Sequence, residues 1–508
     1  MDFPWLSLIV FLPTLGALGL TLWPKEVDHA FARLWTLGVS LMTAGVSLGM
    51  ALQYDFSSTH AQFIERHGWI QPLGISYTLS VDGISLPMVL LTSLLVVLSI
   101  LTSWNLKERP RFYYVLLMLL TTGVQGAFLA QDLLLFFLFY ELELIPLYFL
   151  IAVWGGARRE YAAMKFLLYT VFSSVFLLIA FLGIYFVSGL HTFDVQALAK
   201  PAVPYSMTFQ ILTLVSLTVG FGIKIPIVPL HTWLPDAHVE APTSVSVLLA
   251  GVLLKLGTYG ILRFGIGLFP DAAVNLSWVL ATLAAINVVY ASFAALAQTD
   301  MKKMIAYSSV AHMGYVLLGI ATLQETGLQG AVYQMVSHGV ISALLFMLVG
   351  LVYEHAHTRD LNKLGGLFDR SRGLPLVGAF MVAAAMANAG MPGMSGFVAE
   401  FLVFKGGWAQ FPLATALCIF GTVLTAIYLL LLLKKAFFGS IPTHREEISQ
   451  PKPMAYFPAT VLAFCMVGLG LLPNLMTQVS AASVTALVNQ MNTGAAVAEV
   501  VKVPQATP

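Results

Sequence analysis

The chain has 508 residues, of which 58% are hydrophobic and 10% are charged, and its mean hydropathy is +0.86. Soluble domains carry about 25% charged residues, so this composition excludes an ordinary soluble protein. The formal net charge of +1 gives no reason to expect nucleic acid as a partner.

Apolar runs long enough to cross a bilayer follow one another almost without pause, which predicts a polytopic membrane protein built from helices. The length of the runs and the lack of period-2 alternation argue against barrel strands. We place about fourteen spans, at roughly 3–23, 31–53, 78–102, 112–130, 132–154, 163–188, 207–230, 244–268, 276–298, 303–321, 327–352, 375–408, 411–438 and 455–475.

The two ends of the chain differ in character. The first span is not expected to be a cleavable signal, because no basic residues precede it and further spans follow at once. The Ala-, Val- and Thr-rich tail after about residue 476 is expected to form a short surface helix followed by disorder.

Lysine and arginine are concentrated in the odd-numbered connections between the spans, for example at Arg109, Arg158, Lys302, Arg370 and Lys434. The even-numbered connections hold few of them. The positive-inside rule therefore places the basic connections on the cytoplasmic side and both termini outside.

Ionisable residues inside the predicted spans are the candidates for function. Lys224 and Lys255 each have a long apolar run on at least one side, and Glu141 and Glu400 occupy similar positions. A charge at the centre of a bilayer helix costs about 2.5–3.5 kcal/mol even on the mildest scale, so it is expected to be functional. These residues indicate a protein that moves charge, most simply protons, within a membrane.

Two spans are interrupted beside such a residue. The seventh span reads GFGIKIPIVPLHTWLP, with prolines directly after Lys224, and the twelfth reads ANAGMPGMSGFVAEF, with Gly390 and Pro392 shortly before Glu400. Proline removes a backbone donor and breaks the helix. Paired interrupted spans in corresponding halves are typical of inverted-repeat transporters whose site lies at the breaks.

The predicted fold class is therefore an all-α polytopic membrane protein of about 14 transmembrane helices, with two inverted five-helix repeats that each contain a broken helix. The expected organisation assigns helices 1–3 to residues 1–110, the first repeat to 111–270, the second repeat to 271–440, and the last helix with the tail to 441–508.

Several motifs resemble the antiporter-like membrane subunits of respiratory complex I, and specifically the chain 4 (M-type) family. They are KIPIVPLHTWLPDAH (224–238), AQTDMKKMIAYSSVAHMGYVLLG (297–319), MVSHG (335–339), RDLNKLGGL (359–367) and GMPGMSGFVAEF (390–401). The stretch ELELIPLYFLIAVWGGARREYAAMKFLLYT (141–170) is similar to the chain 4 type found in the cyanobacterial and chloroplast NAD(P)H dehydrogenase-like complex, although Tyr140 stands where that family commonly has Trp.

The resemblance implies roles for the ionisable residues. Glu141 on the fifth span would pair with Lys224 on the seventh, Lys255 would carry the central relay, and Glu400 would open toward the outer side. Four histidines match family histidines along the central polar axis: His231, His238, His312 and His338.

Other polar residues have competing interpretations. A lone histidine is more often a hydrogen-bonded core residue than a relay, and His231 and His238 are candidates for satisfying backbone groups at the broken helix end. Glu143 is either a second gate or a neutral acid bonded to backbone, and Lys165 is either functional or an interface anchor. Four aspartates are expected to cap helices or face loops: Asp82, Asp132, Asp236 and Asp300.

The two cysteines, Cys418 and Cys465, lie apart in apolar spans, and the sequence has no metal-ligand pattern or nucleotide-binding glycine loop. No cofactor is therefore expected in this chain, and quinone and iron–sulfur clusters are expected in partner subunits.

The predicted function is that of a proton-translocating subunit of an NAD(P)H- or ferredoxin-dependent quinone oxidoreductase, with plastoquinone as the expected quinone. The partners are expected to be other membrane subunits and lipid, and the location a cyanobacterial thylakoid or bacterial inner membrane. Three alternatives stay open: a subunit of the CO2-uptake variant of the same complex, a subunit of a multi-subunit cation/proton antiporter, and a passive scaffold. The first rests on the stretch LLAGVLLKLGTYGILRFGIGLFPDA (248–272), which resembles the chain 4 variants of CO2-uptake complexes.

Overall fold

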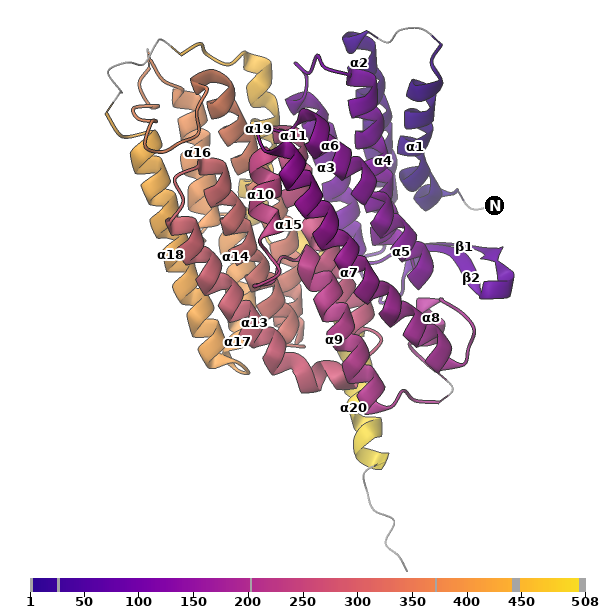
Figure 1. The fold of residues 1–508 in the computed structure, drawn as a ribbon. Coiled ribbons are helices and arrows are strands. Elements are labelled where there is room, and N and C mark those ends of the chain that lie inside the picture. The colour runs from indigo at the N-terminus through magenta and orange to yellow at the C-terminus, as the bar shows by residue number, and fades with distance from the viewer. Residues whose placement is uncertain (1–2, 25–27, 202, 371, 441–447, 502–508) are drawn as a thin grey trace, which may run out of the picture.

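The computed structural model describes residues 3–24, 28–201, 203–370, 372–440 and 448–501. Long helices lie side by side from α1 and α2 at one edge of the molecule to α18 at the other (Figure 1). Within the described residues, thirteen helices are long and apolar enough to cross a membrane. The broken helix of residues 375–408 supplies one more span. The predicted helical membrane fold is therefore confirmed.

Most spans are continuous helices whose apolar sequences support a full membrane crossing. These are α1 (Trp5–Leu22), α2 (His29–Ala51), α3 (Ser85–Thr102), α4 (Pro110–Leu129), α7 (Arg159–Ser188), α13 (Pro270–Leu296), α14 (Met301–Ala321), α15 (Glu325–Ala356), α18 (Pro412–Ala436) and α19 (Pro453–Leu471).

Four spans are irregular. The fifth span consists of α5 (Leu133–Leu142) and α6 (Leu144–Trp154), and the seventh consists of α9 (Met207–Lys224) and α10 (Trp233–Glu240). The eighth span consists of α11 (Thr243–Leu248), η2 (Leu249–Leu253), α12 (Leu254–Gly260) and η3 (Ile261–Ile266). The twelfth span consists of α16 (Pro375–Asn388) and α17 (Ser395–Trp408). The breaks in the seventh and twelfth spans were predicted. The π-helical turns η2 and η3 of the eighth span were not.

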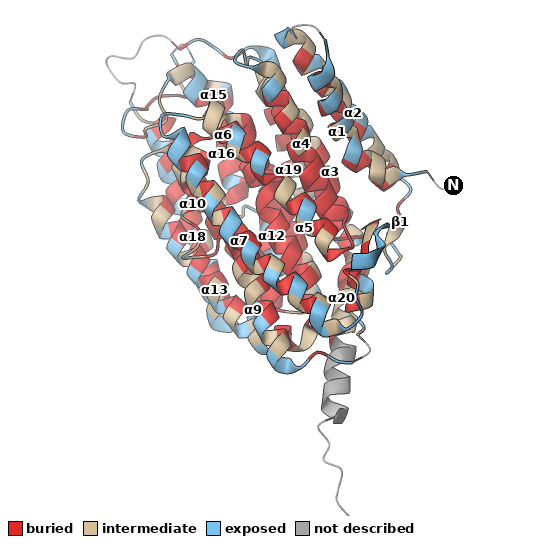
Figure 2. Ribbon diagram, turned by 45° about the vertical axis from the view of Figure 1, so that its right-hand side comes forward, coloured by how far each residue is buried: buried red, intermediate tan, exposed pale blue. Residues whose placement is uncertain are grey.

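The eighth span is the core of the bundle. All of its most apolar stretch is buried, and the adjoining helices α14 and α15 are buried over 94% and 89% of theirs. By contrast, α2 and α19 are buried over only 28%. Figure 2 shows this as a red interior at α12, with pale-blue exposed residues on outer helices such as α7. A charge on the eighth span is therefore shielded from lipid on every side.

The connections alternate between two ends of the bundle, as the predicted topology requires. At one end, Arg359 of the eleventh connection donates to the carbonyl of Val239, beside the seventh connection, at 2.8 Å. At the other end, Arg66 of the second connection pairs with Asp194 of the sixth at 2.8 Å. The basic odd-numbered connections thus lie together, opposite the even-numbered ones.

One prediction about the chain's local structure was wrong. Residues 78–84 do not begin the third span; they belong to the end of an antiparallel hairpin and the turn after it. The hairpin pairs β1 (Gln62–Ile70) with β2 (Ile75–Val81) around the turn η1 (Gln71–Leu73). The alternation of Tyr77, Leu79 and Val81 with polar residues supports a strand, but it was absorbed into the apolar run that follows.

The tail also differs from its prediction. It forms the 28-residue helix α20 (Asn474–Val501), and Ser480, Val484 and Met491 are buried against the bundle. The helix is therefore a packed element and not a short surface helix. The predicted disorder falls on residues 502–508, outside the described residues.

Three of the four aspartates expected at helix starts are found there. The carboxylates of Asp132, Asp300 and Asp82 accept hydrogen bonds from backbone N–H groups at the starts of α5, α14 and α3. Asp236 is an exception, because it lies inside α10 and pairs with Lys165 of α7 at 2.7 Å. The remaining short helix, α8 (Val195–Leu198), is capped by Asp194.

The topology is testable with reporters on the two sides of the membrane. We expect a reporter fused after Pro508 to lie outside and one inserted beside Arg370 to lie in the cytoplasm, because the basic connections are retained inside. Protease access in sealed and opened vesicles measures this. If both reporters lie on the same side, the number of spans between them is wrong.

Candidate functional site

Each predicted site residue within the spans is buried at or near the centre of the bundle, except Glu141, which is half-buried. Lys224 and Lys255 expose 1% and 0% of their surfaces, and Glu400 exposes 3%. Hydrogen bonds, electrostatic interactions and ring stacking sort these residues into two groups. The Lys224 cluster consists of Lys224, Glu143, Glu141 and Ser174, and the Lys255 cluster consists of Lys255, His338, His312 and Glu400.

In the Lys224 cluster the lysine pairs with Glu143 and not with Glu141. The pairing implied by the family resemblance was therefore wrong for this structure. Glu141 instead contacts the hydroxyl of Ser174 on α7. The helix changes direction between the two carboxylates, because Pro146 removes the donor that would have bonded to the carbonyl of Leu142.

The break in the seventh span sets the position of Lys224, the last residue of α9. The chain is irregular from 225 to 232, and its freed backbone groups are satisfied by protein. The indole of Trp233 donates to the carbonyl of Ile223 at 2.8 Å, and the amide oxygen of Asn287 accepts from the N–H of Val228 at 2.7 Å.

The histidines beside this break were candidates for that backbone-satisfying role. Trp233 and Asn287 fill it at Ile223 and Val228, and His231 also interacts with the backbone of Pro229. The ring of His231 packs on Tyr290, with centroids 5.1 Å apart. His238 is fully buried and stacks on Phe346 at 4.4 Å. Neither ring nitrogen of His238 has a hydrogen-bond partner among the described residues.

Lys255 lies on α12, directly after the π-helical turn η2. Its ammonium contacts the carbonyl of Ala250, inside that turn, and lies 2.8 Å from Nδ1 of His338 on α15. A π-helical turn displaces the backbone hydrogen bonds by one residue, and such turns occur often at functional sites. Glycines at 251, 257, 260 and 265 were the only hint of this irregularity in the sequence.

The Lys255 cluster continues to the broken twelfth span. The rings of His338 and His312 are stacked with centroids 5.6 Å apart, and Nδ1 of His312 lies 3.7 Å from Oε1 of Glu400. The side-chain amide nitrogen of Gln334 is hydrogen-bonded to the same Nδ1 at 3.0 Å, and the hydroxyl of Thr422 donates to Oε2 of Glu400 at 3.0 Å.

Gly390 makes room for the Glu400 carboxylate. Its φ of +72° lies in the left-handed region, and a Cβ there would come within 2.9 Å of Oε2 of Glu400. The glycine-rich break therefore both ends α16 and shapes the pocket for the acid.

The two clusters are separate. The hydrogen bonds described for Lys224 lead to Glu143, whereas those of Lys255 lead to Ala250 and His338. Transfer between them requires bridging water or a movement of the side chains. Within the described residues, no group of three or more His, Cys, Asp or Glu side chains is arranged to hold a metal ion.

A buried lysine at the basic end was missed from the sequence. Lys302 was counted as a loop residue, but it is only 6% exposed and donates to the carbonyl of Ala241 at the end of α10. Lys302 and Lys255 both interact electrostatically with His238. The sequence alone does not show which of the two adjacent lysines is buried, since Lys303, the half-buried neighbour, has the same side chain.

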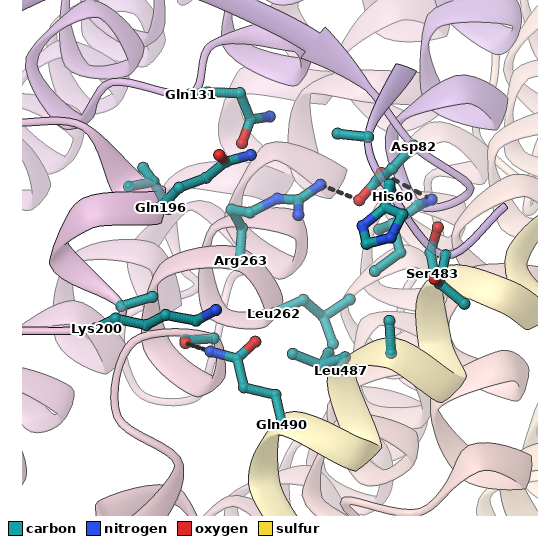
Figure 3. Close-up of a pocket in the computed structure, with 17 residues that line it drawn as sticks. His60, Asp82, Gln131, Gln196, Lys200, Leu262, Arg263, Ser483, Leu487 and Gln490 are labelled. Atoms are coloured by element: carbon teal, nitrogen blue, oxygen red, sulfur yellow. Dashed lines mark hydrogen bonds and ion pairs between the residues drawn. The ribbon is translucent and has the colours of Figure 1, made fainter. Parts of the chain in front are cut away.

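At the opposite end, the eighth span meets a polar cavity of about 380 Å³ between the hairpin, α8 and α20. Figure 3 shows Arg263 reaching across it to Asp82, with Gln131 and Gln196 on one side and Gln490 below. The guanidinium lies 2.5 Å from the Asp82 carboxylate. Burial alone would raise the pKa of Asp82, but Arg263 and backbone N–H groups hold this pKa below its usual value.

The comparisons with known proteins identify the family. Residues 130–425 match the family described as NADH:quinone oxidoreductase/Mrp antiporter, TM, and residues 32–127 match NADH-ubiquinone oxidoreductase chain 4, amino terminus. The NAD(P)H-quinone oxidoreductase chain 4 1 of Synechococcus sp. (strain JA-3-3Ab) is 42% identical over 502 residues, covering 97% of this chain and 94% of that protein. This chain belongs to the chain 4 family.

Solved structures share the fold of this chain. A chain of respiratory complex I from Thermus thermophilus with bound NADH has 27% identity and a TM-score of 0.86, covering 96% of this chain and 99% of that one. A chain of the Mrp complex from Dietzia sp. DQ12-45-1b has 23% identity and a TM-score of 0.83, covering 97% and 100%, and shares the fold. The protein is thus a complex I-like, antiporter-like subunit of the proton-translocating type.

The Asp82–Arg263 pair is expected to stabilise the end of the eighth span that lies opposite the basic connections. Because the Asp82 pKa is lowered, the pair stabilises the fold above the carboxyl's unfolded pKa, and this contribution is lost as pH falls. Asp82→Asn leaves Arg263 without its carboxylate and should cost up to about 3 kcal/mol.

Thermal dissociation of the purified complex near neutral pH measures this cost. Asp55→Asn is the control, since Asp55 is an exposed carboxylate that bonds only locally, to Ser57. Equal melting temperatures for the two variants would show that the pair contributes nothing.

Proposed function

We propose that this chain carries protons from the basic, cytoplasmic end of the bundle to the opposite side through the Lys255 cluster, and that the Lys224 cluster controls this transfer. The observation that carries the proposal is the buried series of neighbouring titratable side chains from Lys255 through His338 and His312 to Glu400. Four titratable groups in one buried series have no simple structural purpose, because each is costly to place at membrane depth.

Electron transfer in partner subunits would supply the energy. The relatives' names support an NAD(P)H-dependent quinone oxidoreductase. Ferredoxin as the alternative electron donor, and quinone and iron–sulfur clusters in other subunits, stay predictions of the sequence. The cyanobacterial source of those relatives supports plastoquinone as acceptor and a thylakoid membrane as location, with a bacterial inner membrane as the alternative. The partners are other antiporter-like and small membrane subunits.

The proposed sequence of steps begins at the Lys224 cluster. A change of charge at that side of the subunit disturbs the Lys224–Glu143 pair, and the altered field favours release of a proton from Lys255. Its ammonium donates to Nδ1 of His338. The rings of His338 and His312 are stacked without a hydrogen bond, so water or ring movement carries the proton to His312 and on to the carboxylate of Glu400, which releases it to the opposite side. Lys255 is afterwards reprotonated from the cytoplasmic side.

His238 and Lys302 support a route for that reprotonation. His238 is within Coulombic range of both Lys302 and Lys255, and both of its ring nitrogens are unpaired among the described residues. An unpaired buried imidazole is able to accept a proton on one nitrogen and release it from the other. Moving one charge against 100 mV costs about 2.3 kcal/mol, which altered pairing of buried charges can supply.

The antiporter alternative is less well supported. The Mrp complex shares the fold at 23% identity, whereas chain 4 proteins are 42% identical over nearly the whole chain. Sodium-dependent transport without redox partners would favour the antiporter. The CO2-uptake variant stays a prediction of the sequence, which a co-purifying carbonic-anhydrase-like protein would support.

Lys255 gives the sharpest test of the proton route. Lys255→Ala should lower proton uptake per assembled complex by about tenfold or more, because the relay loses a group that gains and releases a proton. Lys255→Arg should not restore uptake, since a guanidinium stays protonated.

The measurement is redox-driven proton uptake into vesicles, normalised to the amount of complex. Lys363→Arg, in the eleventh connection, is the control for the chemical change itself. Full uptake with Lys255→Arg would make Lys255 a fixed countercharge and would exclude the proposed relay.

A further inference from the structure

The polar cavity of about 380 Å³ at the end of the bundle opposite the basic connections has no part in the proposed proton route. Segments far apart in the sequence enclose it: the loop 59–61 before the hairpin, the turn after β2, α8, the end of the eighth span and α20. The side chain of Arg263 extends across it, so we call it the Arg263 cavity (Figure 3). Its volume is in the range of sites that bind small molecules.

The charged groups of the Arg263 cavity favour an anion as its ligand. Arg263 and Lys200 line the cavity, and Asp82 is the one carboxylate among the described residues that line it. One positive charge is therefore left without a counterion inside the cavity. A divalent cation is disfavoured by this balance, because it needs several anionic or carbonyl oxygens. An apolar molecule is disfavoured too, since it would leave the charged groups without partners.

Asp82 fixes the guanidinium of Arg263 and leaves one of its nitrogens free. The Asp82 carboxylate is bonded on both oxygens, to Nη2 of Arg263 through Oδ2 and to the N–H groups of Ile84 and Ser85 through Oδ1. Nε of Arg263 donates to the hydroxyl of Tyr259 at 3.3 Å. Nη1 has no hydrogen-bond partner in the described part of the chain, so it is the group left to donate to a ligand.

Lys200 supplies the second cation of the cavity. It is exposed, it follows α8, and its ammonium has no hydrogen-bond or ion-pair partner among the residues that the structure describes. Figure 3 shows its side chain extending into the cavity from the side of α8, where Gln196 adds a side-chain amide. Cationic and amide donors that converge from different elements are typical of a site for an oxyanion, which accepts several hydrogen bonds at once.

The helix α20 closes the cavity, and Gly83 is what allows it to come so near. The N–H of Gly83 donates to the hydroxyl of Ser483 at 2.8 Å, and a Cβ at position 83 would come within 2.0 Å of the carbonyl oxygen of Val479. Farther along α20, the amide of Gln490 donates to the carbonyl of Gly267 at 2.9 Å. The helix therefore bridges the turn after β2 and the end of the eighth span.

We propose that the Arg263 cavity binds a single oxyanion group, a phosphate or a phosphodiester, through Nη1 of Arg263 and the ammonium of Lys200. Inorganic phosphate and the headgroup of an anionic phospholipid in the leaflet at this end of the bundle offer the same chemistry. The bound anion joins α8 to the eighth span beneath α20 and so stabilises this end of the subunit. The inference goes beyond the proposed function, because the site holds a ligand and carries no proton.

The experiment uses the purified, assembled complex after delipidation in detergent, with two probes. In one arm, sodium phosphate is titrated at an ionic strength held constant with sodium chloride. In the other, nanodiscs of phosphatidylcholine are compared with nanodiscs that also contain phosphatidylglycerol. The readout is the temperature at which the complex dissociates, since a ligand that binds the folded state raises it. We expect at least one probe to raise this temperature in the unsubstituted complex.

Lys200→Gln should lower the apparent affinity for the stabilising probe by about tenfold or more, because it removes a charge-assisted hydrogen bond. Lys200 is exposed, so this variant should assemble normally. Lys200→Arg should retain the effect, since the charge and the donors are kept. Lys405→Gln is the matched control: it removes an exposed lysine in the last turn of α17, at the same end of the bundle but outside the cavity.

The two arms distinguish the sources of the anion. Saturable stabilisation by phosphate indicates a free anion, and stabilisation by phosphatidylglycerol alone indicates a lipid headgroup. Both results support the site when Lys200→Gln weakens the effect and Lys405→Gln does not. Equal weakening in these two variants would show non-specific attraction and overturn the site, as would the absence of stabilisation by either probe. Proton uptake in Lys255→Ala tests the proposed function separately, so the two conclusions stand or fall independently.

Discussion

A positive charge held in the middle of a membrane protein is the constraint on which this structure depends. An unpaired ammonium at that depth is strongly disfavoured, and breaking a buried ion pair costs about 3–5 kcal/mol. Lys224 is stabilised by Glu143 and by two aromatic rings. Lys255 has no carboxylate in hydrogen-bonding contact among the described residues and relies on a backbone carbonyl and a histidine. The second lysine is therefore the one with less to hold its proton.

The irregular helices follow from the same constraint. A regular helix pairs its N–H groups and carbonyls with one another, so few backbone groups are left to interact with an ionised side chain buried beside it. At Lys224 and Glu400 the chain uses proline and glycine to open the helix, and at Lys255 it uses π-helical turns. Each opening frees backbone groups at the depth of an ionisable residue. In the seventh span, Trp233 and Asn287 form hydrogen bonds with two such groups, the carbonyl of Ile223 and the N–H of Val228.

Much of this could be predicted from the sequence. Lys224, Lys255 and Glu400 stand out because apolar surroundings make a charge conspicuous, and Pro and Gly mark two of the openings. The partner of Lys224 could not be chosen, because Glu141 and Glu143 are two residues apart and the direction each faces depends on the kink at Pro146. The π-helical turns also escaped prediction, since their hydrogen bonds depend on packing against neighbouring helices. The β1–β2 hairpin was missed because residues 78–84, which include the Asp82–Gly83 turn, were assigned to the start of the third span.

The separation of the two clusters matters as much as the contacts within them. An unbroken series of titratable groups across the membrane would let protons return down their gradient and would dissipate the work of the redox reaction. Here the Lys255 cluster leads to the broken twelfth span, while the Lys224 cluster faces the lateral surface through Glu141. The Lys224 cluster is then best placed to sense charge and the Lys255 cluster to carry it. Coupling through the electric field needs no proton to pass between them, so control of the relay and resistance to leakage arise from one arrangement.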